Sequence, residues 1–274
     1  MKKITLILLI LIGIGSAKAQ EYKKIDSCST IFIYSYQFYD EHKNPESLKL
    51  QDMVLEVGKK YSKFCSETTL YTDSLIMLHA NDSPDAAIKN IYSQIRDLPS
   101  HIFSSYSIYK GYPEANTTLF SGRDLGAAGR YNVSEEIDFS WKIDNSAKKK
   151  ILGMSCTKAT CSYGGRDYEA WFTTEIPIND GPYKFKGLPG LILRIADSEN
   201  EHAFELQEIK NINRPIYYVD HKPMKTDAKG YAKALEASKV THINRLNSIS
   251  YSDDAMRVKA IAKVQRRNNF IEKY

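Results

Sequence analysis

The stretch that decides the fold runs from Lys149 to Glu175 and reads KKILGMSCTKATCSYGGRDYEAWFTTE. Two glycines, Gly164 and Gly165, separate two segments in which apolar and polar residues alternate. A two-residue glycine turn of this kind joins antiparallel strands. We therefore predict a β-hairpin with one continuous strand over 149–163 and a returning strand over 166–175.

The two-residue turn also fixes the register of this hairpin. Cys161 should lie opposite Tyr168 on one face of the sheet, and Lys158 should lie opposite Trp171 on the other. The same register pairs Ala159 with Ala170, Thr157 with Phe172 and Thr160 with Glu169. One face is then apolar and the other mixed, and on the mixed face the Lys158 ammonium is expected to contact the Trp171 ring.

Downstream of the hairpin, Lys184–Ile195 reads KFKGLPGLILRI. Residues 188–191 fit a type II turn, in which proline fixes φ at the second position and glycine takes a positive φ at the third. Alternatively, the backbone amides of this turn, flanked by Lys184 and Lys186, could bind an anion. The motif over 187–192 holds no nucleophile, acid or base, so we favour a structural turn that leads into a buried strand at 191–196.

Patterns elsewhere indicate more strands and a few helices. Apolar alternation predicts strands at 30–39, 48–57, 61–66, 104–109, 117–120, 140–144 and 203–209. Ser83 and Pro84 predict the start of a helix near 83–97, and Thr226 and Ser252 are expected to cap two C-terminal helices. The predicted fold is α+β and β-dominated: a curved antiparallel sheet that could form a half-barrel, with a helix inserted near 83–97 and C-terminal helices.

The N-terminus reads MKKITLILLILIGIGSAKAQ and has the three parts of a secretory signal peptide. Lysines precede an apolar run, and an A-x-A site predicts cleavage between Ala19 and Gln20. The run is shorter than the ~20 residues that a membrane span needs. We therefore expect residues 1–19 to be removed, and residues 20–274 to form a single domain without a transmembrane anchor. The expected location is the periplasm, the outer-membrane surface or the extracellular medium.

Charge argues against one class of partner. The formal net charge is +5, but three of the 38 Lys and Arg residues lie in the predicted signal peptide, so the mature chain is close to +2. Such a weak overall charge is not typical of a nucleic-acid-binding protein. Four cysteines, at 28, 65, 156 and 161, are expected in a compartment that permits disulfides. Residues 156 and 161 would lie about 16 Å apart on one continuous strand, so any bridge should involve Cys28 or Cys65.

No catalytic residue, cofactor-binding residue or metal ligand is predicted, and no cofactor is expected. The chain lacks the G-x-S-x-G, P-loop, G-x-G-x-x-G and H-E-x-x-H patterns. Its six histidines, at 42, 79, 101, 202, 221 and 242, never pair at metal-ligand spacing. A site assembled from distant residues is still open, with His101 and His202 as the histidines to test.

Several segments resemble one known family. Ile151–Leu193 is similar to the core block of the GLPGLI family, also called Porph_ging, of exported proteins from Bacteroidota, and VGKKYSKFCS upstream resembles its "SKF-S" segment. The family has no assigned activity, so the resemblance implies no catalytic residues. Its signature corresponds here to Gly187, Leu188, Pro189, Gly190, Leu191 and Ile192.

These observations lead to three functional hypotheses. The favoured one is a non-enzymatic cell-envelope protein that binds a ligand or a protein partner, in the manner of a half-barrel carrier. Its candidate ligand contacts are Lys158, Trp171, Tyr183 and Phe185. The alternatives are an exported hydrolase with a site assembled from distant residues, and a structural accessory of an outer-membrane transporter.

Overall fold

The computed structural model describes residues 21–95, 106–123, 129–220, 222–248, 254–267 and 269–273. Its strands are β1 (Glu21–Tyr39), β2 (Leu48–Gly58), β3 (Ser62–Ser66), β4 (Ser107–Lys110), β5 (Thr117–Arg123), β6 (Arg130–Glu136), β7 (Lys142–Ile151), β8 (Met154–Tyr163), β9 (Arg166–Thr173), β10 (Leu191–Asp197), β11 (His202–Asp220) and β12 (Met224–Thr226). The helices are the 3₁₀ turn η1 (Pro45–Ser47), α2 (Glu67–Leu78), α3 (Pro84–Ile95), α4 (Ala228–Ser248) and α5 (Asp254–Arg266).

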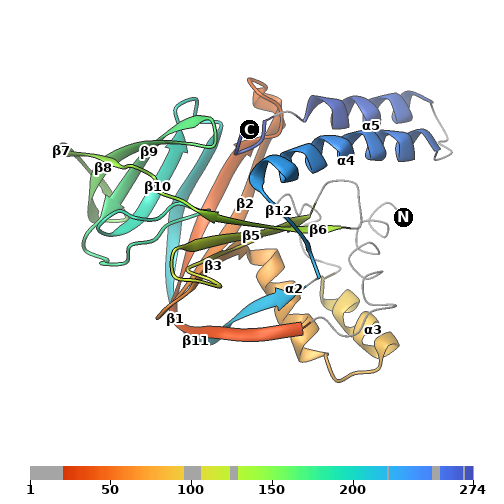
Figure 1. Ribbon diagram of the computed structural model, residues 1–274, viewed down its shortest axis with the longest axis horizontal. Coiled ribbons are helices and arrows are strands. Elements are labelled where there is room, and N and C mark those ends of the chain that lie inside the picture. The colour runs from red at the N-terminus through yellow and green to blue at the C-terminus, as the bar shows by residue number, and fades with distance from the viewer. Residues whose placement is uncertain are drawn as a thin grey trace.

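The described strands form a single open, curved sheet in the order β12-β6-β5-β4-β3-β2-β1-β11-β10-β9-β8-β7. The β-dominated α+β class is therefore confirmed. Neighbouring strands are antiparallel except for β12, which runs parallel to β6, so the sheet is mixed. Figure 1 shows β7–β10 at one end of the molecule, with α4 and α5 lying side by side at the other.

Strand β1 lies at the centre of the sheet and buries both of its faces. Its alternation is confirmed: Phe32, Tyr34, Tyr36 and Phe38 all enter the main core. Ile31 and its alternating neighbour Ile33 enter a second cluster, which α2 covers with Leu70. The strand can be buried on both faces because helices and loops cover both sides of the sheet.

The hairpin at 164–165 has the predicted register. Lys158 pairs with Trp171 and Cys161 with Tyr168. Both turn glycines take positive φ, 55° and 73°, as a twisted two-residue turn requires. The first strand, however, was predicted wrongly as continuous over 149–163. Leu152 and Gly153 also take positive φ, 49° and 80°, and they reverse the chain between β7 and β8.

Several other elements differ from the prediction. Strand β11 extends to Asp220, well beyond the predicted end at 209, because it pairs along almost all of β1. Strand β6 and helix α2 were not predicted. Helix α2 starts where the Ser66 hydroxyl accepts a hydrogen bond from the Thr69 amide, 3.1 Å away. Helix α4 is capped by Asp227, whose carboxylate accepts from the Gly230 amide, rather than by Thr226.

Several predictions fall partly or wholly outside the described residues. The expected signal peptide, the cleavage site at Ala19 and Gln20, the cap at Ser252, and residues 96–97 of the expected helix near 83–97 lie there. All four cysteines are described, and each is a buried free thiol. Among the described helices, none combines the length and the apolar character needed to cross a bilayer.

The segment between β9 and β10 packs on the apolar side of the curved sheet, where a half-barrel carrier would bind an apolar ligand. Tyr183, Phe185 and Leu188 from this segment are at most 2% exposed and join the same core as the aromatic face of β1. The apolar side of the curved sheet is therefore packed with the chain's own side chains.

Candidate functional site

A short segment after α5, residues 269–273, lies against the hairpin turn between β8 and β9. The Lys273 amide donates a hydrogen bond to the Gly164 carbonyl, 2.6 Å away. The approach is so close that an added Cβ at Gly164 would lie 2.9 Å from the Glu272 side chain. An added Cβ at Gly165 would lie 2.7 Å from the Lys273 carbonyl oxygen. The two glycines thus allow the turn to form and also let this docked segment approach it.

Five side chains hold the docked segment, and we call them the cradle: Tyr163, Arg166, Tyr168, Tyr183 and Lys184. Within it, Arg166 binds the backbone. Its guanidinium donates to the Phe270 carbonyl at 2.7 Å and to the Asn269 side chain at 2.5 Å, and it pairs with Asp197 at 2.6 Å. The Tyr168 hydroxyl donates to the Ile271 carbonyl at 3.0 Å.

The other half of the cradle binds one carboxylate, that of Glu272. Its Oε1 lies 2.7 Å from the Lys184 ammonium and accepts from the hydroxyls of Tyr183, at 2.6 Å, and Tyr163, at 3.0 Å. The Lys184 side chain is 2% exposed, and aromatic rings surround its ammonium, including Phe120 at 5.6 Å. Burial and the Glu272 charge raise the pKa of Tyr183 well above its usual value, so this hydroxyl stays a donor.

Among the residues that the structure describes, this half of the cradle brings two carboxylates to one ammonium. Lys184 forms a second ion pair, with Glu135, so two carboxylates meet one buried ammonium. The pair of Lys184 and Glu135 is neutral by itself. Glu272 is therefore not needed to neutralise the lysine.

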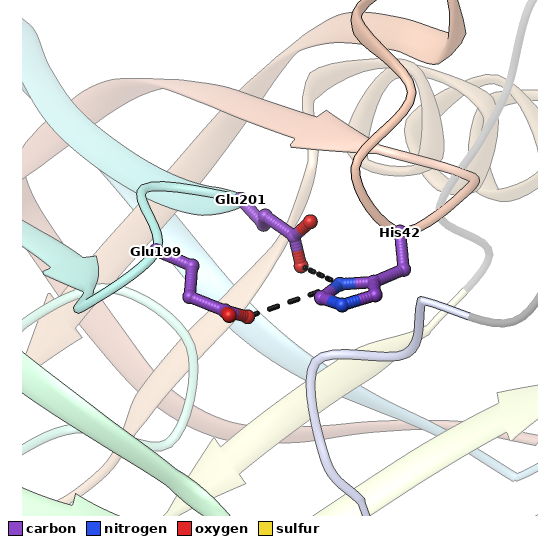
Figure 2. A group of neighbouring side chains, drawn as sticks. All are labelled: His42, Glu199 and Glu201. Atoms are coloured by element: carbon purple, nitrogen blue, oxygen red, sulfur yellow. Dashed lines mark hydrogen bonds and ion pairs between the residues drawn. The ribbon is translucent and has the colours of Figure 1, made fainter.

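Arg166 also connects the cradle to two turns at one end of the sheet. Its partner Asp197 accepts hydrogen bonds from the amides of Glu201, at 2.7 Å, and His202, at 2.9 Å, and so shapes the turn between β10 and β11. Glu201 in turn contacts His42 Nδ1 at 2.9 Å, and Glu199 lies 3.8 Å from the same nitrogen. Figure 2 shows these three side chains pointing toward one another.

The pKa of Glu201 is lowered. Burial acts against ionisation, but the Lys43 amide, the imidazole of His42 and the Arg166 guanidinium outweigh it. Among the described residues, His42, Glu199 and Glu201 are the cluster whose nitrogen and oxygen atoms lie close enough for one metal ion, within 4.8 Å of one another.

One of the two histidines named for the hydrolase hypothesis is enclosed in the core. His202 is 2% exposed, hydrogen-bonds to the Tyr36 hydroxyl at 2.7 Å and stacks on the rings of Tyr36 and Phe38. Burial, followed by the Arg166 charge, lowers its pKa from 6.5 to about 3. A neutral, enclosed imidazole cannot reach a substrate, so the described contacts of His202 do not favour hydrolysis. His101 lies outside the described residues.

A hollow of about 700 Å³ opens beside the cradle, where strands β7–β9 end. Phe139, Lys142, Cys161 and Tyr168 contribute to its wall, and its other lining residues carry hydroxyls or carboxylates. They come from Ser140, Thr160, Ser162, Ser198, Asp138, Asp167 and Glu169.

The residues predicted as ligand contacts divide into two groups. Lys158 and Trp171 lie on the mixed face, and both bind Glu169, at 2.6 Å and 2.7 Å. The ammonium over the Trp171 ring, however, is that of Lys149, at 4.2 Å, so the predicted contact with Lys158 was assigned to the wrong lysine. Tyr183 and Phe185 lie in the core, where Tyr183 reaches Glu272 with its hydroxyl.

The signature motif forms a turn, but not of type II. The Gly190 amide donates to the Leu188 carbonyl at 2.8 Å, and Gly190 has a nearly extended φ of 159°, unlike the third residue of a type II turn. Other amides are also occupied: Gly187 donates to the Asn179 side chain, and Leu191 donates to the Ile176 carbonyl. These amides cannot form an anion-binding nest, which supports the structural interpretation.

A model of the family described as "Protein of unknown function (Porph_ging)" matches residues 164–194. The predicted GLPGLI resemblance is confirmed for this segment. It contains the hairpin glycines, the signature motif and four of the five cradle residues, all but Tyr163. No curated protein is similar enough to this chain to match it.

Solved structures of PNGF-II are similar to part of the chain. The structure in space group P21 gives a TM-score of 0.48 at 16% identity, and the structure in space group C2 gives 0.47 at 14% identity. Each match covers 78% of this chain and 34% of the PNGF-II chain. The chain thus spans about a third of the length of the solved structures that it matches.

Sequence reasoning missed the cradle because its parts are far apart in the chain. Lys184 was considered only as a neighbour of a possible anion-binding turn, and no role was predicted for Arg166 or for residues 269–273. One signal was available. Lys184 lies in the run YKFKGLPGLI, whose aromatic and apolar residues favour burial. A lysine that is buried with them needs a carboxylate partner.

Proposed function

We infer that this is an exported, non-enzymatic protein of the cell envelope that binds a protein partner through the cradle. The partner would present an extended segment with one carboxylate, in the place that residues 269–273 occupy. The observation that carries this proposal is the triple contact of Glu272 Oε1 with Lys184, Tyr163 and Tyr183.

The contacts of the cradle support exchange of one segment for another. Arg166 and Tyr168 bind backbone carbonyls, which every peptide has, so they select an extended shape rather than a sequence. Selectivity comes from the carboxylate position and from the Asn269 side chain, which accepts from Arg166. The neutral pair of Lys184 and Glu135 is left behind when Glu272 departs, so release leaves no unpaired buried ammonium.

Export is a separate part of the proposal and rests on the sequence of residues 1–20. Intact-mass analysis of the protein from its native envelope fraction should give a chain that begins at Gln20. Recovery of a chain that retains residues 1–19, or its presence only in the cytoplasm, would overturn this part.

The binding proposal is tested with a fluorescein-labelled peptide of sequence NNFIEKY, measured by fluorescence polarisation. Glu272→Gln weakens the docked segment, so this variant should bind the peptide at least about tenfold more tightly than the parent chain. Adding Lys184→Met to Glu272→Gln should abolish this gain in affinity for the peptide. Adding Lys186→Met is the matched control, because that lysine is two residues away and only partly buried.

A peptide with glutamine in place of glutamate should bind Glu272→Gln no better than it binds the parent chain. Near-UV circular dichroism confirms that each variant is folded. Equal affinity of the parent chain and Glu272→Gln for the glutamate peptide, together with unchanged hydrogen exchange in 269–273, would contradict a displaceable segment.

A further inference from the structure

We propose that His42, Glu199 and Glu201 form a binding site for a divalent transition-metal ion of the zinc class. The site lies outside the cradle, at the end of the sheet where the turn after β1 meets the turn between β10 and β11. In Figure 2 the imidazole from one turn faces both carboxylates from the other.

The distances suit one shared ion. Two ligand atoms that each lie about 2.1 Å from a tetrahedral ion are about 3.4 Å apart. His42 Nδ1 lies 2.9 Å from the Glu201 carboxylate and 3.8 Å from that of Glu199, so the observed separations fall on either side of this value. All three ligand atoms lie within 4.8 Å of one another. Small side-chain rotations would therefore complete the coordination.

Both turns are held in place by contacts that do not involve the ion. Glu201 is fixed by the Lys43 amide, which donates to its Oε1 at 2.8 Å, and its own amide donates to Asp197. The turn that carries His42 is closed by the Ser47 side chain, which accepts from the Glu41 amide at 3.1 Å. A framework that is ordered in advance loses little entropy when the ion binds.

The local charge favours a divalent cation. Arg166 lies 3.6 Å from Glu201, but it is already paired with Asp197 at 2.6 Å. Glu199 and Glu201 therefore add two negative charges beside His42, and Arg166, which is shared with Asp197, offsets them only in part. An ion of charge +2 would neutralise them, and Nδ1 would then be a ligand instead of a hydrogen-bond donor.

The kind of ligand narrows the choice of ion. One imidazole nitrogen with two carboxylate oxygens suits zinc and its neighbours, whereas calcium and magnesium prefer sites made of oxygen alone. The His42 and Glu199 side chains are 36% and 44% exposed, so the ion can enter from solvent and can keep water at its remaining positions. An ion here would link the two turns and so stabilise the folded chain.

The test uses the mature chain without a histidine tag, first stripped with EDTA. Zinc is titrated in competition with a chromophoric chelator. We expect one equivalent per chain and, at a zinc concentration of about a hundred times Kd, a rise in Tm of about 5 °C. Magnesium and calcium should produce neither effect. His42→Ala and Glu199→Gln, both at exposed turn positions, should each weaken zinc binding at least tenfold.

His79→Ala is the matched control. Its imidazole lies 2.8 Å from one carboxylate, that of Asp82, but belongs to no three-ligand cluster among the described residues. The His79→Ala variant should therefore bind zinc with the same affinity as the parent chain. Zinc binding that is unchanged in His42→Ala, absent at micromolar zinc, or replaced by preference for calcium would overturn the proposal.

Discussion

The ammonium of Lys149 lies over the ring of Trp171, 4.2 Å from its centroid, while the neighbouring Lys158 turns to Glu169. Lys158 is on β8, next to the strand of the tryptophan, whereas Lys149 is on β7, one strand further away. A double-mutant cycle can distinguish the two lysines. Coupling of Lys149→Ala with Trp171→Leu should be about 0.5–1 kcal/mol in urea unfolding, the usual value for a partly exposed cation–π contact. Coupling of Lys158→Ala with Trp171→Leu should be smaller, and the reverse order would contradict the observed contact.

Replacement of Gly190 by alanine should destabilise the fold because of close packing. An added Cβ would overlap the Thr173 carbonyl oxygen and lie 2.7 Å from the carbonyl carbon, and both are backbone atoms that cannot move independently. We expect a loss of about 1–3 kcal/mol in the free energy of unfolding, measured with urea. An unchanged midpoint with reduced peptide binding would show instead that the motif contacts a ligand.

Gly165→Ala should release the docked segment. Gly165 and Gly153 have similar φ values, 73° and 80°, so alanine costs each turn about the same, roughly 1 kcal/mol. Only the Cβ at Gly165 meets the docked segment, 2.7 Å from the Lys273 carbonyl oxygen, whereas that at Gly153 has open space.

Hydrogen exchange measured by mass spectrometry should therefore rise in 269–273 for Gly165→Ala and stay at the parental level for Gly153→Ala. Equal protection of the segment in both variants would contradict the close approach of the docked segment to the turn.

His202 should make stability fall in mild acid. Its pKa is lowered from 6.5 to about 3 in the folded chain, mainly by burial, so between these values the unfolded chain binds a proton that the folded chain does not. The contribution of neutral His202 to the free energy of unfolding is complete above pH 6.5 and is lost as pH falls toward 3. About 2 kcal/mol of it is lost between pH 7.5 and pH 5.0.

The difference in unfolding free energy between the parent chain and His202→Gln isolates this effect, because the carboxylates titrate alike in both. The difference should shrink by about 2 kcal/mol over that range. A difference that is constant with pH would mean that His202 becomes protonated without unfolding.

The hairpin shows what the sequence could predict. Two adjacent glycines allow one turn, and that turn fixes the pairing of every residue on both strands, including Lys158 with Trp171. The division between β7 and β8 was missed because a lone glycine at 153 is compatible with a strand. Only pairing with a neighbouring segment reveals the reversal there.

The candidate site was much less predictable. The contact between Lys184 and Glu272 joins residues that are far apart in the chain, and neither has a local pattern that identifies its partner. The same holds for His42 and Glu201, which meet because β1 and β11 pair. Local periodicity describes strands and turns, but such meetings depend on the order of strands in the sheet.

The pairing of β1 with β11 also has a kinetic consequence. It joins Glu21 to Asp220 and Phe38 to His202, residues roughly 160 to 200 positions apart, in the middle of the sheet. A growing chain can pair β1 with β2 early, but the other edge of β1 stays open until the last third of the chain arrives. Folding should accordingly be slow and should be completed only when nearly the whole chain is present. An interrupted chain would expose β1, the most aromatic of the described strands, to aggregation.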